Sequence, residues 1–197
     1  MTMSANTKTW IPFAIALAAA AGLILYGAFA AQNEHFRTRP TEVGSLFTTL
    51  GTIAVYVAAA GFSWLWFKKK FRSPSMLVRR VCKLLHALHR ALGWSTLALG
   101  AAHGAYWLVN RPLDDNSYTG LASFAILLVV AGYGLFVPKI RNKWMRLAHR
   151  TLGIAWAPVL FLHAGGSAIA AVGIVIGVGV LVRMLESIAS RPATTRE

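Results

Sequence analysis

The stretch that decides the fold is "HRALGWSTLALGAAH", from His89 to His103, because the chain repeats its layout as "HRTLGIAWAPVLFLH", from His149 to His163. In each copy, two histidines stand fourteen residues apart in a segment that is otherwise mostly apolar. Fourteen residues at about 100° each return to nearly the same side of an α-helix, about 21 Å further along its axis. Each copy therefore predicts a helix with two histidines on one face, separated by most of the thickness of a bilayer.

The composition is that of an integral membrane protein. Of the 197 residues, 56% are hydrophobic and only 13% are charged, whereas a soluble domain of this length carries about 25% charged residues. The net charge of +14 comes mainly from short basic clusters between apolar segments, so we expect membrane lipid as the surroundings and no nucleic-acid partner. We expect a single domain over residues 1–197, with its core at 44–185.

Six apolar segments predict the architecture. Each is about as long as the roughly 20 residues that cross a bilayer, and backbone groups in lipid must be paired internally, so each predicts a helix. We therefore expect an all-α integral membrane fold, a six-transmembrane-helix bundle. The first segment has a rival interpretation as a cleaved signal peptide, because it ends in "AFAA"; cleavage would leave five spans. The segments are 10–31, 44–67, 81–109, 119–137, 144–164 and 167–185.

The loops predict the orientation. Basic residues crowd the loops at 68–83 and 139–146, whereas the loop at 110–119 holds Asp114, Asp115 and one arginine. Positively charged loops stay on the cytoplasmic side. We therefore expect both termini in the cytoplasm of a bacterial cell, with the protein in the inner (plasma) membrane.

Two helices with this histidine pattern predict two facing pairs. If the helices at 81–109 and 144–164 pack side by side, His89 meets His149 near the cytoplasmic face and His103 meets His163 near the outer face. Histidines inside a membrane mark functional sites. Two ligands are too few for a closed zinc site, and the segment centres carry no carboxylate for a hard cation or a proton relay. Haem iron takes two axial ligands on opposite sides of a flat ring, so the pairs predict two b-type haems between the third and fifth helices.

Neighbouring residues give further candidates for haem contacts. Both copies begin H-R-x-L-G, so Arg90 and Arg150 lie at the cytoplasmic boundary, where a guanidinium group can pair with a haem propionate or simply reach the interface. Gly93 and Gly153 follow on the histidine face, where they clear space for a porphyrin edge or for helix packing. His86, one turn before the inner ligand of the first copy, is the alternative iron ligand.

These histidine repeats resemble the ferric reductase-like transmembrane domain family. That family includes ferric reductases, NADPH oxidases and the haem-binding membrane subunit of a bacterial methionine sulfoxide reductase system. The resemblance covers the six-span layout and is strongest over residues 81–165, including "WMRLAHRTLG". It implies electron transfer across the membrane, from a cytoplasmic reductant to an acceptor on the outer face.

The source of the electrons stays open. The sequence holds no Gly-rich dinucleotide fingerprint, so we expect a separate cytoplasmic flavoprotein reductase, or quinol, to be the donor. The chain would then be an oxidoreductase component; whether it is itself an enzyme is not decided. The alternatives are a quinol-oxidising cytochrome b anchor of a larger complex and a haem-free membrane interaction protein.

Overall fold

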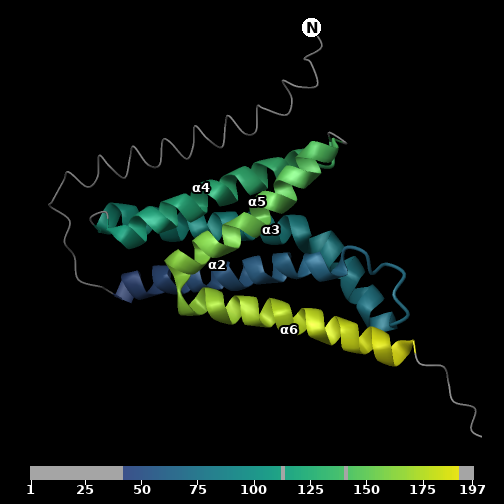
Figure 1. Ribbon diagram of the computed structural model, residues 1–197. Coiled ribbons are helices and arrows are strands. Elements are labelled where there is room, and N and C mark those ends of the chain that lie inside the picture. Colours follow the sequence, from purple (N-terminus) through teal and green to yellow (C-terminus); the bar gives the residue numbers. More distant parts are fainter. Residues whose placement is uncertain (1–41, 112–113, 140–141, 191–197) are drawn as a thin grey trace, which may run out of the picture.

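The computed structural model describes residues 42–111, 114–139 and 142–190, and its secondary structure in these ranges is helical. Five helices are labelled in Figure 1. The expected segment 10–31 lies outside the described residues. The helices are α2 (Glu42–Phe67), α3 (Met76–Asn110), α4 (Asp115–Phe136), α5 (Lys143–Ala164) and α6 (Gly166–Ala189).

The order in which the described helices pack places them around a ring in chain order, and Figure 1 shows α6 beside α2. Each helix packs against the next one, and α6 returns to pack against α2 and, less extensively, α3. The closely packed pairs do not include α3 with α5. The two histidine helices therefore do not lie side by side as expected; they face each other across the ring.

The prediction of a six-transmembrane-helix bundle is wrong. The described part of the chain holds five helices, and three of them are long and apolar enough to cross a membrane: α2, α4 and α6. The histidine helices α3 and α5 are not among the three, because basic residues and histidines interrupt their apolar sequence. The three apolar helices nevertheless support the coarser expectation of a membrane protein.

Polar side chains define where three helices begin. Ser75, Asp114 and Asn142 each accept a hydrogen bond from a backbone N–H of the first turn of α3, α4 and α5, respectively. These groups have no partner inside the helix, so the caps stabilise the helix starts. The Ser117 hydroxyl, which donates to the Asp114 carboxylate over 2.7 Å, holds the pKa of Asp114 below its usual value.

Close contacts near the C-terminal end of α6 join this helix to the rest of the ring. A Cβ on Gly179 of α6 would collide with the indole of Trp66 on α2, so only glycine allows this approach. Nearby, the Lys70 ammonium group forms an ion pair with the Glu186 carboxylate at 2.5 Å. A loop lysine thus ties the end of α2 to the end of α6.

Candidate functional site

The structure brings the four repeated histidines together as two pairs. The ring centres of His89 and His149 lie 6.2 Å apart, and those of His103 and His163 lie 6.0 Å apart. The ring planes within the two pairs meet at 86° and 73°. Since the members of each pair come from α3 and α5, the imidazoles bridge the ring of helices at two levels.

Backbone carbonyl groups orient three of the four imidazoles. Nδ1 of His103 lies 2.7 Å from the Phe47 oxygen, Nδ1 of His149 lies 2.9 Å from the Val130 oxygen, and Nδ1 of His163 lies 3.0 Å from the Asn116 oxygen. A carbonyl oxygen only accepts, so Nδ1 must carry the hydrogen in each case. The neutral ring then keeps a bare lone pair on Nε2, which is the form that binds a metal.

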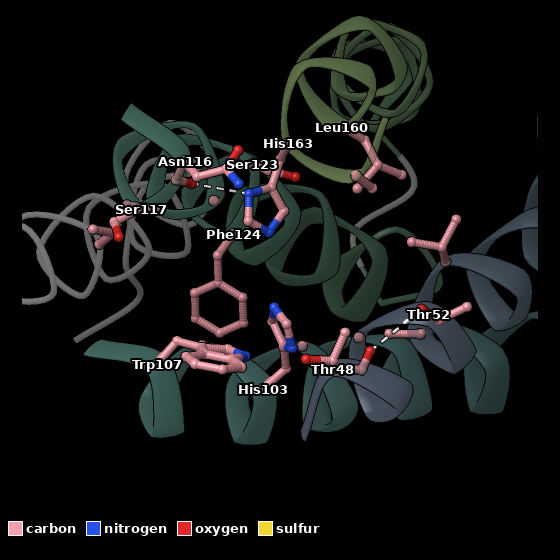
Figure 2. Close-up of a pocket in the computed structure, with 18 of the residues that line it drawn as sticks. Thr48, Thr52, His103, Trp107, Asn116, Ser117, Ser123, Phe124, Leu160 and His163 are labelled. Carbon is pink, nitrogen blue, oxygen red and sulfur yellow. Dashed lines mark hydrogen bonds between the residues drawn. The ribbon is translucent and has the colours of Figure 1, made fainter. Parts of the chain in front are cut away.

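Figure 2 shows this arrangement for His103 and His163, called the outer pair after the predicted orientation, with His89 and His149 as the inner pair. The His163 ring turns one nitrogen towards Asn116 and the other towards His103, whose own second nitrogen points back across the gap (Figure 2). The two Nε2 atoms therefore face each other from α3 and α5. This is the disposition that two axial ligands of one flat metal complex require.

Glycines make room for the same three rings. A Cβ on Gly51 of α2 would come within 2.6 Å of the His103 ring, and one on Gly120 of α4 would come within 2.6 Å of the His163 ring. A Cβ on Gly134 of α4 would lie 3.1 Å from the His149 ring. The histidine helices supply the imidazoles, and α2 and α4 supply the carbonyls and the space that hold them.

His89 is the exception among the four. Its Nδ1 is buried and has no hydrogen-bond partner among the described residues. The Gly61 carbonyl lies within interacting range of the ring, although Nδ1 and this oxygen do not reach hydrogen-bond geometry. The ring instead lies against the Trp64 indole, with centres 6.2 Å apart.

The alternative inner ligand, His86, occupies a different environment. Its ring centre is 5.2 Å from that of Trp64 and 5.5 Å from that of Phe71. Its side of α3 is exposed. The structure brings His89, and not His86, to His149.

A pocket of about 930 Å³ surrounds the outer pair and takes lining residues from all five described helices. Most of its wall is apolar, with small residues such as Gly100 and Gly104 on the His103 side. Ligand pockets commonly have about 300–1,000 Å³ and a few convergent polar groups. The space between α3 and α5 is therefore large enough for a sizeable flat ligand between the two imidazoles.

The outer mouth of this pocket is polar, which the sequence interpretation missed. Arg111 lines it, with its guanidinium group 4.3 Å from the centre of the Trp107 ring. Asn116 and Ser117, at the start of α4, and Thr48, on α2, line it as well (Figure 2). Asp114 also lines the pocket, so a bound ligand would meet one cation and one carboxylate near the outer histidines.

The other predicted contact residues remain predictions. Arg90 and Arg150 are exposed, and the ion pair found among the described residues joins Lys70 to Glu186 instead. A Cβ on Gly93 or on Gly153 would meet nothing within 4 Å, so both glycines border open space. That space is compatible with a ligand edge but does not identify one.

Trp156 lies between the two histidine pairs and was not predicted from the sequence to be a site residue. It stands seven residues after His149 and seven before His163 on α5. Its indole N–H donates to the backbone oxygen of Ser123 at 2.9 Å and to the hydroxyl oxygen at 2.8 Å. This buried side chain ties α5 to α4 midway between the histidine pairs.

The described residues contain no group of three or more histidine, cysteine, aspartate or glutamate side chains that could hold a metal ion. This finding corrects the second half of the fold prediction, since the structure shows no haem site between α3 and α5. The structure shows two pairs of imidazoles. In three of these four rings, the Nε2 lone pair is free to bind a metal. A pair suits a metal that brings its own equatorial ligands.

Comparisons with protein-family models, curated proteins and solved structures found no match for this chain. The resemblance to ferric reductase-like proteins therefore stays a prediction based on the histidine repeats.

Proposed function

We propose that the protein carries electrons across a membrane with two b-type haems, one held by His89 and His149 and the other by His103 and His163. In this proposal the protein is a ferric reductase-like component that takes electrons from a cytoplasmic flavoprotein and passes them to an acceptor on the outer face. Haem, when bound, supplies one-electron chemistry, and the protein supplies ligands and their surroundings.

The observation that carries the proposal is the pairing of imidazoles at two levels with nearly equal separations of 6.2 and 6.0 Å. Two metal–nitrogen bonds of about 2 Å each, together with half the width of each imidazole, span roughly 6 Å. Chance contacts between core histidines would not need to repeat at this distance. The spacing supports an axial ligand pair at each level.

The donor set supports haem over a bare metal ion. Each level offers two imidazoles without a third histidine, cysteine or carboxylate among the described residues. Zinc takes four protein ligands in structural sites and three in catalytic sites. Haem iron needs only the two axial positions, because the porphyrin fills the rest.

The charge distribution supports cytoplasmic entry of electrons. Exposed basic side chains lie at the ends of α3 and α5 that carry His89 and His149, among them Arg79, Arg80 and Arg146. A positive surface speeds encounter with an acidic partner in a salt-dependent way. Lys70 contributes less to such a surface, because it is already paired with Glu186.

The deciding experiment measures haem in the purified full-length protein. We expect about two b haems per chain by pyridine haemochrome analysis, with the low-spin spectrum of six-coordinate iron. A protein that stays colourless after expression with added haem precursor and after reconstitution with haemin would refute the proposal and favour a haem-free interaction protein.

A second measurement separates the two possible donors. Proteoliposomes that contain the haem-loaded protein are mixed in a stopped-flow instrument with a reduced flavoprotein on one face, or with quinol in the bilayer. We expect faster haem reduction by the flavoprotein from the face that carries the basic loops. Reduction by quinol alone would replace the proposed donor and favour the cytochrome b anchor.

A further inference from the structure

The three oriented imidazoles share one structural rule. In each case the acceptor carbonyl lies four residues before the glycine that borders the same ring: Phe47 before Gly51, Asn116 before Gly120, and Val130 before Gly134. We refer to such a carbonyl with its glycine as an imidazole cradle. One cradle lies on α2 and two lie on α4.

Helix geometry explains why the glycine stands four residues after the carbonyl. Every Cα–Cβ bond in an α-helix tilts towards the N-terminus, so a side chain covers the helix surface one turn before its own Cα. A side chain four residues after a carbonyl therefore shields that oxygen from a donor on a neighbouring helix. Glycine leaves the second lone pair of the oxygen open to Nδ1.

Because α2 packs against α3 and α4 packs against α5, the histidine spacing predicts where a fourth cradle glycine would lie. On α4, the two cradle glycines stand fourteen residues apart, as do His149 and His163 on α5. On α2, the position fourteen residues after Gly51 is Leu65, and the position fourteen residues before His103 on α3 is His89. The residue four before Leu65 is Gly61, whose backbone lies close to the His89 ring. The fourth acceptor, the Gly61 carbonyl, is thus present, but the residue four positions later is a leucine and not a glycine.

We infer that Leu65 takes the place of a fourth cradle glycine and so leaves His89 without the carbonyl hydrogen bond that orients the other three imidazoles. In this account the leucine side chain keeps the His89 ring from approaching the Gly61 carbonyl closely enough, which accounts for the buried Nδ1 without a partner. Leu65 is a positioning residue in this account, because it acts on the imidazole and touches no ligand.

The consequence for the inner site rests on the proposed function. A carbonyl bond to Nδ1 fixes the tautomer and raises the basicity of the ligating nitrogen. His103 and His163 both have this bond, whereas only His149 has it in the inner pair. The inner pair would therefore donate less electron density to a bound iron, and a haem held there would have a higher midpoint potential than it would with a fourth carbonyl bond.

The primary test uses the haem-free protein and does not depend on haem. The full chain, with ¹⁵N-labelled histidine, is studied by NMR in lipid nanodiscs. Cradled rings carry a slowly exchanging hydrogen on Nδ1. We expect three such rings in the wild type and four in Leu65→Gly, because the fourth carbonyl becomes accessible. Leu65→Ala keeps a Cβ at this position, so it should leave the number at three and serves as the matched control.

Two further variants keep the test decisive. Gly51→Ala should reduce the number of cradled rings from three to two through the loss of His103. Leu181→Gly removes a leucine from an exposed position of α6 and should leave the number at three. Four cradled rings in the wild type, or an unchanged number in Leu65→Gly when helix content is retained, would overturn the inference.

Redox titration of the haem-loaded variants tests the consequence separately. Leu65→Gly should lower the midpoint potential of the inner haem, leave that of the outer haem unchanged, and tighten haem retention at the inner site roughly ten- to hundredfold. An unchanged or raised inner potential would refute this consequence. If no haem binds but a fourth cradled ring forms, the proposed function fails and the role of Leu65 stands.

Discussion

The outer and inner histidine pairs come from the same sequence repeat, yet their surroundings differ. Both outer imidazoles donate to backbone carbonyls and border glycines, and a large pocket surrounds them. In the inner pair, His149 has a carbonyl partner and a glycine, whereas Nδ1 of His89 has no partner. The two histidine helices share the fourteen-residue spacing and the H-R-x-L-G start, but the helices that hold the imidazoles differ. The difference shows that a repeat of histidines does not by itself produce equal surroundings.

The largest effects should come from removal of a ligand. His163→Ala deletes one outer imidazole, so we expect haem content to fall from about two to about one per chain, with the inner haem retained. His149→Ala should have the opposite selectivity. Haem content and redox titration of both variants check the pairing.

The matched control for ligand removal is His86→Ala. This ring packs against Trp64 and Phe71 and should be dispensable for haem content. Loss of the inner haem in His86→Ala, with its retention in His89→Ala, would contradict the assignment of the inner pair.

The next largest effect should come from a cradle glycine. A methyl group at Gly120 would come within 2.6 Å of the His163 ring, so Gly120→Ala must displace the imidazole from its carbonyl. Loss of an outer-shell partner typically weakens metal binding about 10- to 100-fold. We expect selective loss of the outer haem on dilution, as measured by haem transfer to an apo-globin. Gly177→Ala is the control, because its Cβ would meet nothing within 4 Å; equal haem loss from both variants would argue against the cradle.

A smaller effect should follow from loss of the cap on α4. Asp114→Ala removes an N-cap, which costs about 1 kcal/mol, and loosens the turn that presents the Asn116 carbonyl to His163. We expect a lower Tm and a modest weakening of the outer site only. If the inner site weakens equally, the cap stabilises the whole ring of helices and not the outer site alone.

The cap should also depend on pH in a defined direction. The hydrogen bond from the Ser117 hydroxyl lowers the pKa of Asp114 in the folded state. The stabilisation is therefore complete above the unfolded pKa of about 3.9 and is lost as the pH falls through the folded value. The difference in Tm between wild type and Asp114→Ala should be constant above about pH 5 and shrink below about pH 4.

The smallest effect should come from the ion pair between Lys70 and Glu186. The side chains of Lys70 and Glu186 are 32% and 18% exposed, so Glu186→Gln should cost no more than about 1 kcal/mol. We expect a slightly lower Tm and unchanged haem content at both levels. Loss of the inner haem would mean that this contact also sets the spacing of the inner pair, which would sharpen the contrast with the outer pair.

Much of the helical layout could be predicted from the sequence. The segments expected at 81–109 and 144–164 correspond to α3 and α5, because apolar length is a strong signal for a helix. The depth-matched histidine pairs also followed from the spacing, since fourteen residues preserve the helix face. The prediction of six spans failed because the histidines and basic residues of α3 and α5 lower the hydropathy of these helices below that of a membrane span. The position of the two helices on opposite sides of a gap is visible only in the packing of the structure.

The support of the imidazoles could not be predicted in the same way. A backbone carbonyl has the same chemistry at every residue, so Phe47, Asn116 and Val130 carry no sequence signal as acceptors. The glycines did carry one, because Gly120 and Gly134 repeat the fourteen-residue interval of the histidines. That interval becomes meaningful only when the pairing of α4 with α5 is known.

The closure of the ring by α6 has a consequence for biogenesis. Among the described helices, α6 packs against both α2 and α5, and it is the last of them to be synthesised. Until it docks, with Gly179 against Trp66, α2 to α5 lack one of their packing partners. If the proposed haems bind, they would enter most readily during this interval. Maturation and cofactor capture would thus be coupled through the timing of one helix.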